Sequence, residues 1–283
     1  MPNIVEKTMK AETFAEQLYF TTILIESEND LGEMSVGTGF IIDAELKNHH
    51  ASFLVTNKHV VAGGKNGILR FHLKKDNGPY PGKGYKLRVP HFEQYWIGHP
   101  DTTVDVTVMS MSLILQQAKS AGKELYYRSI PQHLCPSENE LEKLDAMEEI
   151  VFVGYPSGIY DDTHYLPVAR RGMTASPVQV NHNGERRFLI DAAIFGGSSG
   201  SPVFILDRSM RSNRGAGLVI GNRTHFMGVV AAGYYEETTG RVIQQPIPTM
   251  LGNKMLTVGR QMINLGIVYK SDTVFELAQS LMK

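Results

Sequence analysis

The sequence of 283 residues has a single cysteine, Cys135, and no long run of apolar residues. One cysteine cannot form an internal disulfide, and chains without disulfides are typical of reducing compartments. The N-terminal residues carry charges every few positions and so lack the apolar core of a secretory signal, and no stretch approaches the ~20 apolar residues of a membrane span. We expect a cytoplasmic protein outside the membrane; a secreted form whose signal has been removed is the alternative.

An excess of charge of either sign is also missing. The chain carries 28 basic and 29 acidic side chains, which gives a net charge of −1. Nucleic acids and acidic membrane surfaces are bound mainly through basic patches. The composition therefore predicts neither a nucleic acid nor a membrane as a partner.

Motifs for metals and nucleotide cofactors are absent too. The sequence contains no HExxH, no paired CxxC, no P-loop and no GxGxxG after a strand. These motifs supply the ligand spacing and glycine-rich turns that such groups need. We expect no metal and no cofactor.

Short runs rich in Val, Ile and Phe are what the sequence has in abundance. Turn-forming segments such as DNGPYPGKG and NHNGER separate most of them, and there is no regular alternation of strand and helix. This pattern indicates an all-β barrel or sandwich. The ten expected strands are residues 20–26, 36–42, 51–57, 67–73, 104–111, 149–155, 186–194, 201–206, 225–233 and 263–269.

Helices are expected only outside these strands. Residues 5–18 have a weak helical pattern, and Ser137 with Glu140 forms a capping box at the start of a short helix. A C-terminal helix is expected after Asp272 as its N-cap, because the apolar residues that follow fall on one helical face.

Two side chains at strand ends have the chemistry of a catalytic pair. Asp105 begins the apolar run DVTVM, and a carboxylate buried there needs a partner to offset the loss of hydration. His59 follows the apolar strand that ends in FLVTN, at a point where small residues let the chain turn. A carboxylate that orients an imidazole is part of a catalytic triad; an ordinary core or loop histidine is the alternative.

The segment GGSSGSPVF, residues 196–204, places two serines among glycines. Such a cluster is often a plain loop. It also satisfies GxSxG, the nucleophile elbow of α/β hydrolases, with Ser198 as nucleophile. That esterase interpretation requires a later histidine, and the only one downstream is His225, without an intervening helix.

Five segments occur in an order that resembles one known family. They are GTGFII at 37–42, TNKHVV at 56–61, DVTVM at 105–109, VGYPSG at 153–158 and DAAIFGGSSGSP at 191–202. Together they resemble the trypsin-like, two-barrel serine proteases, in particular their high-temperature-requirement (Deg-type) branch. The resemblance covers residues 20 to 282 and leaves no room for a PDZ module.

The resemblance implies a fold of two six-stranded antiparallel β-barrels packed together, with short terminal helices. An N-terminal extension would cover residues 1–19, a first barrel with His59 and Asp105 residues 20–125, and a connector with a short helix residues 126–148. A second barrel with Ser199 would cover residues 149–270, and a C-terminal helix residues 271–283.

The resemblance also implies the role of each site residue. Ser199 would attack the peptide carbonyl, His59 would transfer the proton, and Asp105 would hold His59. The N–H groups of Gly197 and Ser199 would form the oxyanion hole. Ser198 would shape the turn.

A primary specificity pocket is implied at Ala193, Gly233 and Gly266. A pocket with an alanine floor and glycine walls would accept an apolar side chain before the cut bond. Glu236 and Glu237 offer the alternative of a basic residue there.

Three positions in the site depart from the family pattern. Ser201 replaces a glycine of GxSGGP, and Ser198 replaces the aspartate of digestive-type relatives. Ala231 stands where many relatives have a serine that supports the triad carboxylate.

We therefore expect a serine endopeptidase that acts on protein or peptide substrates, with a regulatory protein as a further candidate partner. A catalytically silent binding module of the same fold is the alternative.

Overall fold

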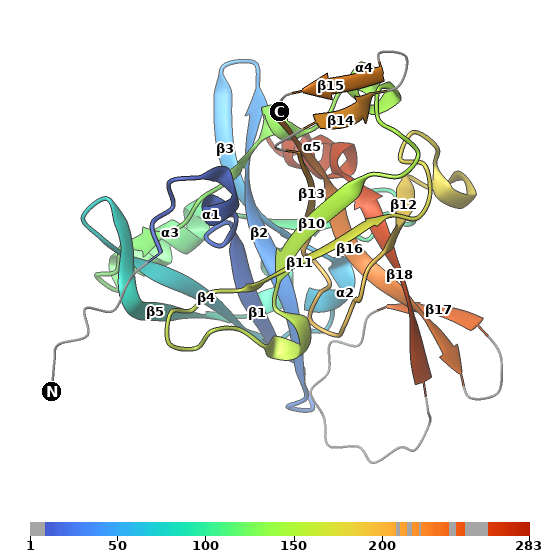
Figure 1. Cartoon of the computed structure of the whole chain (residues 1–283). Coiled ribbons are helices and arrows are strands. Elements are labelled where there is room, and N and C mark those ends of the chain that lie inside the picture. The colour runs from blue at the N-terminus through green and yellow to red at the C-terminus, as the bar shows by residue number, and fades with distance from the viewer. Residues whose placement is uncertain (1–8, 208–209, 214–216, 221, 238–241, 247–259) are drawn as a thin grey trace, which may run out of the picture.

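The computed structural model describes residues 9–207, 210–213, 217–220, 222–237, 242–246 and 260–283. Two β-sheets form the framework of the structure, and they lie side by side with the C-terminal helix between them (Figure 1). The all-β prediction is confirmed. Antiparallel sheets of this kind do not fit the open α/β sheet that the esterase alternative with Ser198 requires.

The N-terminal sheet has nine strands in the order β5-β4-β1-β2-β3-β7-β6, with β8 beside β4 and β9 beside β2. No strand pair closes this sheet into a barrel within the described residues. Its strands are β1 (Thr22–Glu28), β2 (Met34–Leu46), β3 (His49–Thr56), β4 (Asn66–Lys75), β5 (Gly78–Pro90), β6 (Ile97–Gly98), β7 (Thr107–Ser110), β8 (Leu125–Tyr126) and β9 (Ile130–Pro131).

The C-terminal sheet contains a closed six-stranded barrel. The closure runs β13-β10-β11-β12-β18-β16 and returns to β13, while β17 extends it beside β16. A separate hairpin is formed by β14 and β15. The strands are β10 (Glu149–Gly154), β11 (Val168–Thr174), β12 (Arg187–Asp191), β13 (Pro202–Asp207), β14 (Met210–Asn213), β15 (Gly217–Ile220), β16 (Arg223–Glu237), β17 (Val242–Pro246) and β18 (Arg260–Lys270).

Five α-helices connect or flank the strands: α1 (Phe14–Leu18), α2 (Lys58–Val61), α3 (Met111–Ser120), α4 (Glu138–Glu142) and α5 (Ser271–Ser280). None of the helices in the described part of the chain is long and apolar enough to span a membrane.

The helix boundaries partly match the sequence prediction. Ser137 and Glu140 form the expected capping box of α4. The expected cap of the C-terminal helix is wrong by two residues, because Lys270 is its N-cap and Asp272 lies inside its first turn. There the Asp272 carboxylate pairs with Arg186 at 2.9 Å. Of the weak helix expected at 5–18, residues 1–8 lie outside the described residues.

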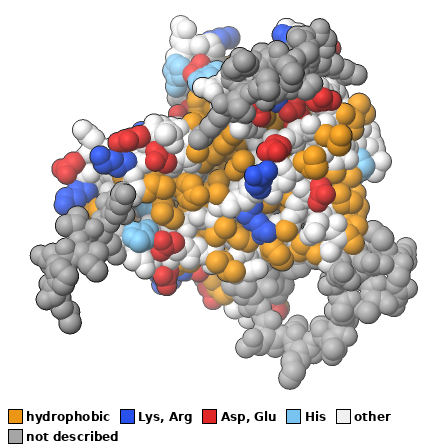
Figure 2. Space-filling model, viewed as in Figure 1, with side chains coloured by type: hydrophobic (Ala, Val, Ile, Leu, Met, Phe, Trp, Pro, Cys, Tyr) orange, Lys and Arg blue, Asp and Glu red, His pale blue; other side chains and the backbone are white. Residues whose placement is uncertain are grey.

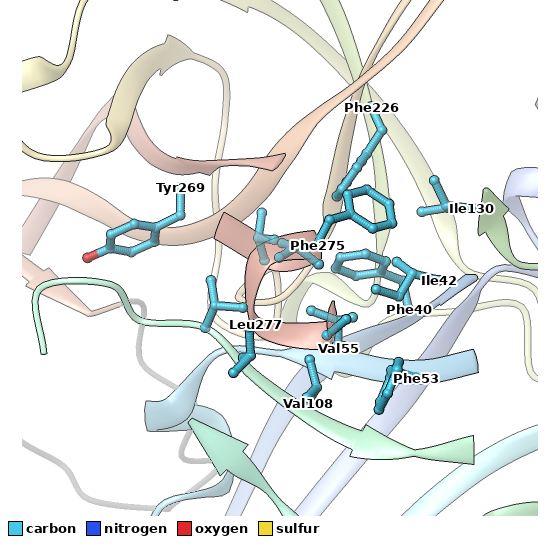
Figure 3. Packing of buried hydrophobic residues seen from close by; sticks show 14 of the residues in the cluster. Phe40, Ile42, Phe53, Val55, Val108, Ile130, Phe226, Tyr269, Phe275 and Leu277 are labelled. Atoms are coloured by element: carbon cyan, nitrogen blue, oxygen red, sulfur yellow. The ribbon is translucent and has the colours of Figure 1, made fainter. Parts of the chain in front are cut away.

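A shared hydrophobic core joins the two halves. Phe40 of β2 packs on Phe226 of β16 with 5.4 Å between ring centroids, and Phe226 packs edge-on against Phe275 of α5 at 6.2 Å (Figure 3). Each fully buried aromatic ring stabilises the fold by about 1.5–3 kcal/mol. The halves therefore form one body, and residues from both can be held at fixed distances.

The surface is mixed in character. On the face seen in Figure 2, acidic and basic side chains lie interspersed among apolar ones.

Candidate active site

Three polar side chains from three different elements meet where the two halves join. His59 lies in α2, directly after β3, Asp105 precedes β7, and Ser199 lies in the loop before β13. The Nδ1 atom of His59 is 2.5 Å from Oδ2 of Asp105, and its Nε2 atom is 2.9 Å from Oγ of Ser199. The structure thus brings the three residues into one hydrogen-bonded line.

These contacts indicate which ring nitrogen of the neutral His59 imidazole carries the hydrogen. An ionised carboxylate only accepts hydrogen bonds, so Nδ1 of His59 carries the hydrogen that points to Asp105. In the neutral ring, Nε2 then has a free lone pair directed at the Ser199 hydroxyl. This arrangement can remove a proton from Ser199.

Backbone contacts hold Asp105 and His59 together. The N–H of His59 donates to Oδ1 of Asp105 at 3.3 Å, and the Asn57 side chain donates to the Asp105 carbonyl oxygen at 2.6 Å. The Lys58 ammonium donates to the carbonyl oxygen of His99 at 2.7 Å. No serine stands at position 231 to support the carboxylate, and the carbonyl oxygen of Ala231 instead accepts from Ser199 Oγ at 3.4 Å.

The carbonyl groups of residues 196–199, in the loop that carries Ser199, all accept hydrogen bonds. The carbonyl of Gly196 accepts from Ser157 N–H, and that of Gly197 accepts from the Thr38 hydroxyl at 2.8 Å. The carbonyl of Ser198 accepts from Ser201 N–H at 3.0 Å, and that of Ser199 from Thr38 N–H at 2.8 Å. Because a trans peptide is planar, a fixed carbonyl also fixes the opposite direction of the N–H in the same peptide.

The N–H groups of Gly197 and Ser199 have no acceptor in the described part of the chain. Both residues are buried. Buried backbone N–H groups without a partner are rare, because each costs the free energy of a lost hydrogen bond. Two such N–H groups beside one serine hydroxyl can bind an oxygen that carries negative charge.

Glycine is required at position 197 for this arrangement of N–H groups. Gly197 has φ +81°, a left-handed conformation that disfavours a side chain. A Cβ there would overlap the Tyr155 carbonyl oxygen and lie 3.2 Å from Ser157 N. The nucleophile loop therefore packs directly on the backbone of residues 155–158.

Ser198 has a different environment from its neighbour. Its Oγ atom accepts from the N–H of Phe195 at 3.3 Å, and its own N–H donates to the Phe195 carbonyl oxygen at 3.0 Å. Both contacts close the turn that precedes Ser199. Ser198 is 1% exposed, and in the described part of the chain its hydroxyl makes no hydrogen bond with His59.

Two of the three predicted pocket residues are adjacent. Gly233 of β16 and Gly266 of β18 are direct cross-strand partners. Ala193, half-buried, follows β12 in the segment that leads to Ser199. The side chains of Glu236 and Glu237 lie outside the described residues.

Ile194 packs on Gly266, although the sequence analysis did not single it out. A Cβ on Gly266 would overlap the Ile194 Cδ1 atom, so this buried side chain fills the space that the glycine leaves. The adjacent Ala193 in DAAIF was the signal that could have pointed to it. Thr38 and Ser157 were missed as well, because they act on backbone atoms far away in the sequence.

Residues that could hold a metal ion do not gather in the described part of the chain, where no group of three or more His, Cys, Asp or Glu side chains is placed for coordination.

Comparison with known proteins agrees with this geometry. A family model described as "Trypsin-like peptidase domain" matches residues 37–210, more than half of the chain and a range that contains His59, Asp105 and Ser199. No curated protein matches the sequence.

The comparison with solved structures found one that is similar in fold and others that match more weakly. One is described as "HtrA-type protease AlgW with tripeptide", with a TM-score of 0.51 and 15% identity over 95% of this chain and 62% of that chain. The thermostable serine protease AL20 has a TM-score of 0.46 and 14% identity over 93% of this chain and 97% of that one. This chain therefore spans about three fifths of the AlgW chain.

Proposed function

We propose that this chain, which belongs to the trypsin-like peptidase family, is a serine endopeptidase that uses Ser199, His59 and Asp105 as its triad. Membership of the family supports serine protease activity. The residues that carry the reaction, the preferred substrate and the state of activity are our proposal.

The reaction begins at the Ser199 hydroxyl. Its Oγ attacks the carbonyl carbon of the substrate peptide bond while its proton passes to Nε2 of His59, 2.9 Å away. Asp105 stabilises the imidazolium that forms, through the contact at Nδ1. His59 then gives the proton to the leaving amine, and an acyl-enzyme remains on Ser199. Water, deprotonated by His59, hydrolyses this ester and restores the serine.

The oxyanion of the tetrahedral intermediate is stabilised by the N–H groups of Gly197 and Ser199. The observation that carries the proposal is the pair of N–H groups without an acceptor, those of the buried residues Gly197 and Ser199, next to a serine hydroxyl that contacts an imidazole. A structural loop would satisfy those two amides internally. Donors fixed in advance need no reorganisation when charge develops, which is why they lower the barrier.

The substrate residue before the cut bond is proposed to be apolar. Ala193 and Ile194 offer no charge to a lysine or arginine, and the Ile194 side chain that packs on Gly266 makes these surroundings apolar. An apolar side chain of medium size fits these surroundings, and discrimination among such residues is modest, at about 1–3 kcal/mol per methylene.

Covalent labelling distinguishes an active enzyme from the alternative, a catalytically silent binding module. A fluorophosphonate probe reacts only with a serine that a neighbouring base activates. We expect one adduct per chain, located by mass spectrometry on Ser199, and no adduct in His59→Ala. A folded wild-type chain that stays unlabelled would contradict the proposal.

A further inference from the structure

Thr38 lies in β2 of the N-terminal sheet, yet its polar groups contact the C-terminal half. It is fully buried. Its hydroxyl donates to the Gly197 carbonyl oxygen at 2.8 Å and accepts the N–H of Tyr155 at 3.0 Å. Its own N–H donates to the Ser199 carbonyl oxygen at 2.8 Å. One residue of the first half thus holds the nucleophile loop at two places.

We propose that Thr38 is a positioning residue that sets the direction of the oxyanion-hole amides; the inference rests on the proposed function. Its hydroxyl joins the nucleophile loop to the segment 155–158. That segment in turn holds the Gly196 carbonyl through Ser157 N–H. The Gly196–Gly197 peptide is held directly by Ser157 at its carbonyl, and Thr38 holds the next peptide, Gly197–Ser198, so that the backbone on the far side of Gly197 is restrained as well.

Because the peptide bond is planar, these contacts also determine where the N–H of Gly197 points. With the Gly196 carbonyl turned toward Ser157, the N–H of Gly197 points the opposite way. Rotation of this peptide by half a turn would aim the carbonyl oxygen, not the N–H, at the developing negative charge. Loss of the Thr38 hydroxyl removes one of the contacts that oppose this rotation.

The space around Thr38 is kept free by two glycines. A Cβ on Gly154 would lie 2.7 Å from Thr38 Oγ1, and a Cβ on Gly200 would overlap the Thr38 carbonyl oxygen. That carbonyl oxygen also accepts from the hydroxyl of Thr56 at 2.7 Å. Hence the Thr38 side chain is locked in one place, as a group that positions others must be.

Thr38→Val tests the role of the hydroxyl, because valine has the same shape without the polar atom. We expect kcat on a chromogenic apolar peptide to fall about 10–100-fold, since the oxyanion donors lose alignment but remain present. KM should stay within about twofold, since ground-state binding does not use the hole. Affinity for a peptide aldehyde, whose hemiacetal oxygen occupies the hole, should fall in parallel with kcat.

Two controls separate positioning from stability. Thr38→Ser restores the hydroxyl and should recover kcat to within about threefold of wild type, because the hydrogen bonds return. Thr273→Val removes another buried hydroxyl, one bonded to the Lys270 carbonyl at 2.7 Å in α5, and should lower the melting temperature without changing kcat. Should Thr38→Val fail to fold, Thr38→Cys, with its weaker donor, is compared with Thr38→Ser.

The possible results separate a failure of the positioning role of Thr38 from a failure of the proposed protease function. A folded Thr38→Val or Thr38→Cys protein with wild-type kcat overturns the positioning role. An equal effect on kcat from Thr273→Val also overturns it, because the effect would then come from stability alone. If wild-type protein itself neither turns over substrate nor takes the fluorophosphonate, the proposed function fails instead.

Discussion

The backbone of Gly197 lies so close to the carbonyl oxygen of Tyr155 that no side chain fits between them. This contact joins the nucleophile loop to the first turn after β10, and it sets the position of one of the two amides without an acceptor. The proposed oxyanion hole therefore depends on a packing contact as well as on hydrogen bonds.

Gly197→Ala should consequently disable the enzyme while leaving most of the fold intact. The added methyl group must displace the 155–158 backbone or the loop itself, which moves an oxyanion donor, and kcat should fall about 100-fold or more. Gly184→Ala is the matched control, because Gly184 also has a positive φ, +78°, but open space around it. The control should lose a little stability and no activity; wild-type kcat in Gly197→Ala would contradict the account.

The size of the specificity pocket should depend on one methyl group. Ile194→Val removes the Cδ1 atom that packs on Gly266, and so deepens the pocket by that volume. We expect the preference for Phe over Val before the cut bond to rise about tenfold in kcat/KM, the change typical of one methylene. Ile205→Val, at an equally buried site of the same barrel, should leave the preference unchanged.

A peptide-library profile measures this preference directly. A wild-type profile dominated by Lys or Arg before the cut bond would show that the pocket assignment is wrong.

The buried His72 should make the fold sensitive to mild acid. Burial lowers the pKa of His72 from its ordinary 6.5 to about 4, and Nε2 has no hydrogen-bond partner among the described residues. Above pH 6.5 the imidazole is neutral in both states. As the pH falls toward 4 the unfolded chain binds a proton that the native state excludes, so the free energy of unfolding drops by up to about 3 kcal/mol.

His72→Leu should remove this part of the acid sensitivity. Urea unfolding at pH 7 and at pH 4.5 measures it as the difference between the two free energies, and the exposed His133→Leu serves as the control. An identical pH dependence in His72→Leu and wild type would refute the prediction.

The sequence predicted where most strands lie but not every element. All ten expected runs coincide with strands, because apolar alternation reports the buried face of a sheet. Strand β5 (Gly78–Pro90) was read as a turn, since it contains prolines and glycines. It is an edge strand, where proline is tolerated because one side of the backbone needs no partner.

Helix α3 was missed for a different reason. The apolar run of β7 continues directly into Met111, so the composition does not change where the strand ends. The boundary is set by Ser110, whose side chain caps the helix by accepting from the Ser112 N–H at 3.3 Å. The Ser110 hydroxyl thus marks the point where β7 ends and α3 begins.

Some residues of the candidate site could be predicted from the sequence and others could not. Motif order pointed to His59, Asp105 and Ser199, because their side-chain chemistry is visible in the sequence. Thr38 contacts a backbone carbonyl across the interface between the halves, Ser157 contacts one within the C-terminal half, and no residue pattern reports such contacts. The fold had to place those residues before their role could be inferred.

The central claim, that Ser199 and not Ser198 is the nucleophile, is tested most directly by comparing kcat for Ser199→Ala and Ser198→Ala on one peptide substrate. Both serines are buried and adjacent, but only Ser199 Oγ contacts His59, at 2.9 Å. Ser199→Ala should lower kcat by about a millionfold, whereas Ser198→Ala, which loses one weak hydrogen bond to Phe195, should cost about tenfold or less. An inactive Ser198→Ala beside an active Ser199→Ala would contradict the account.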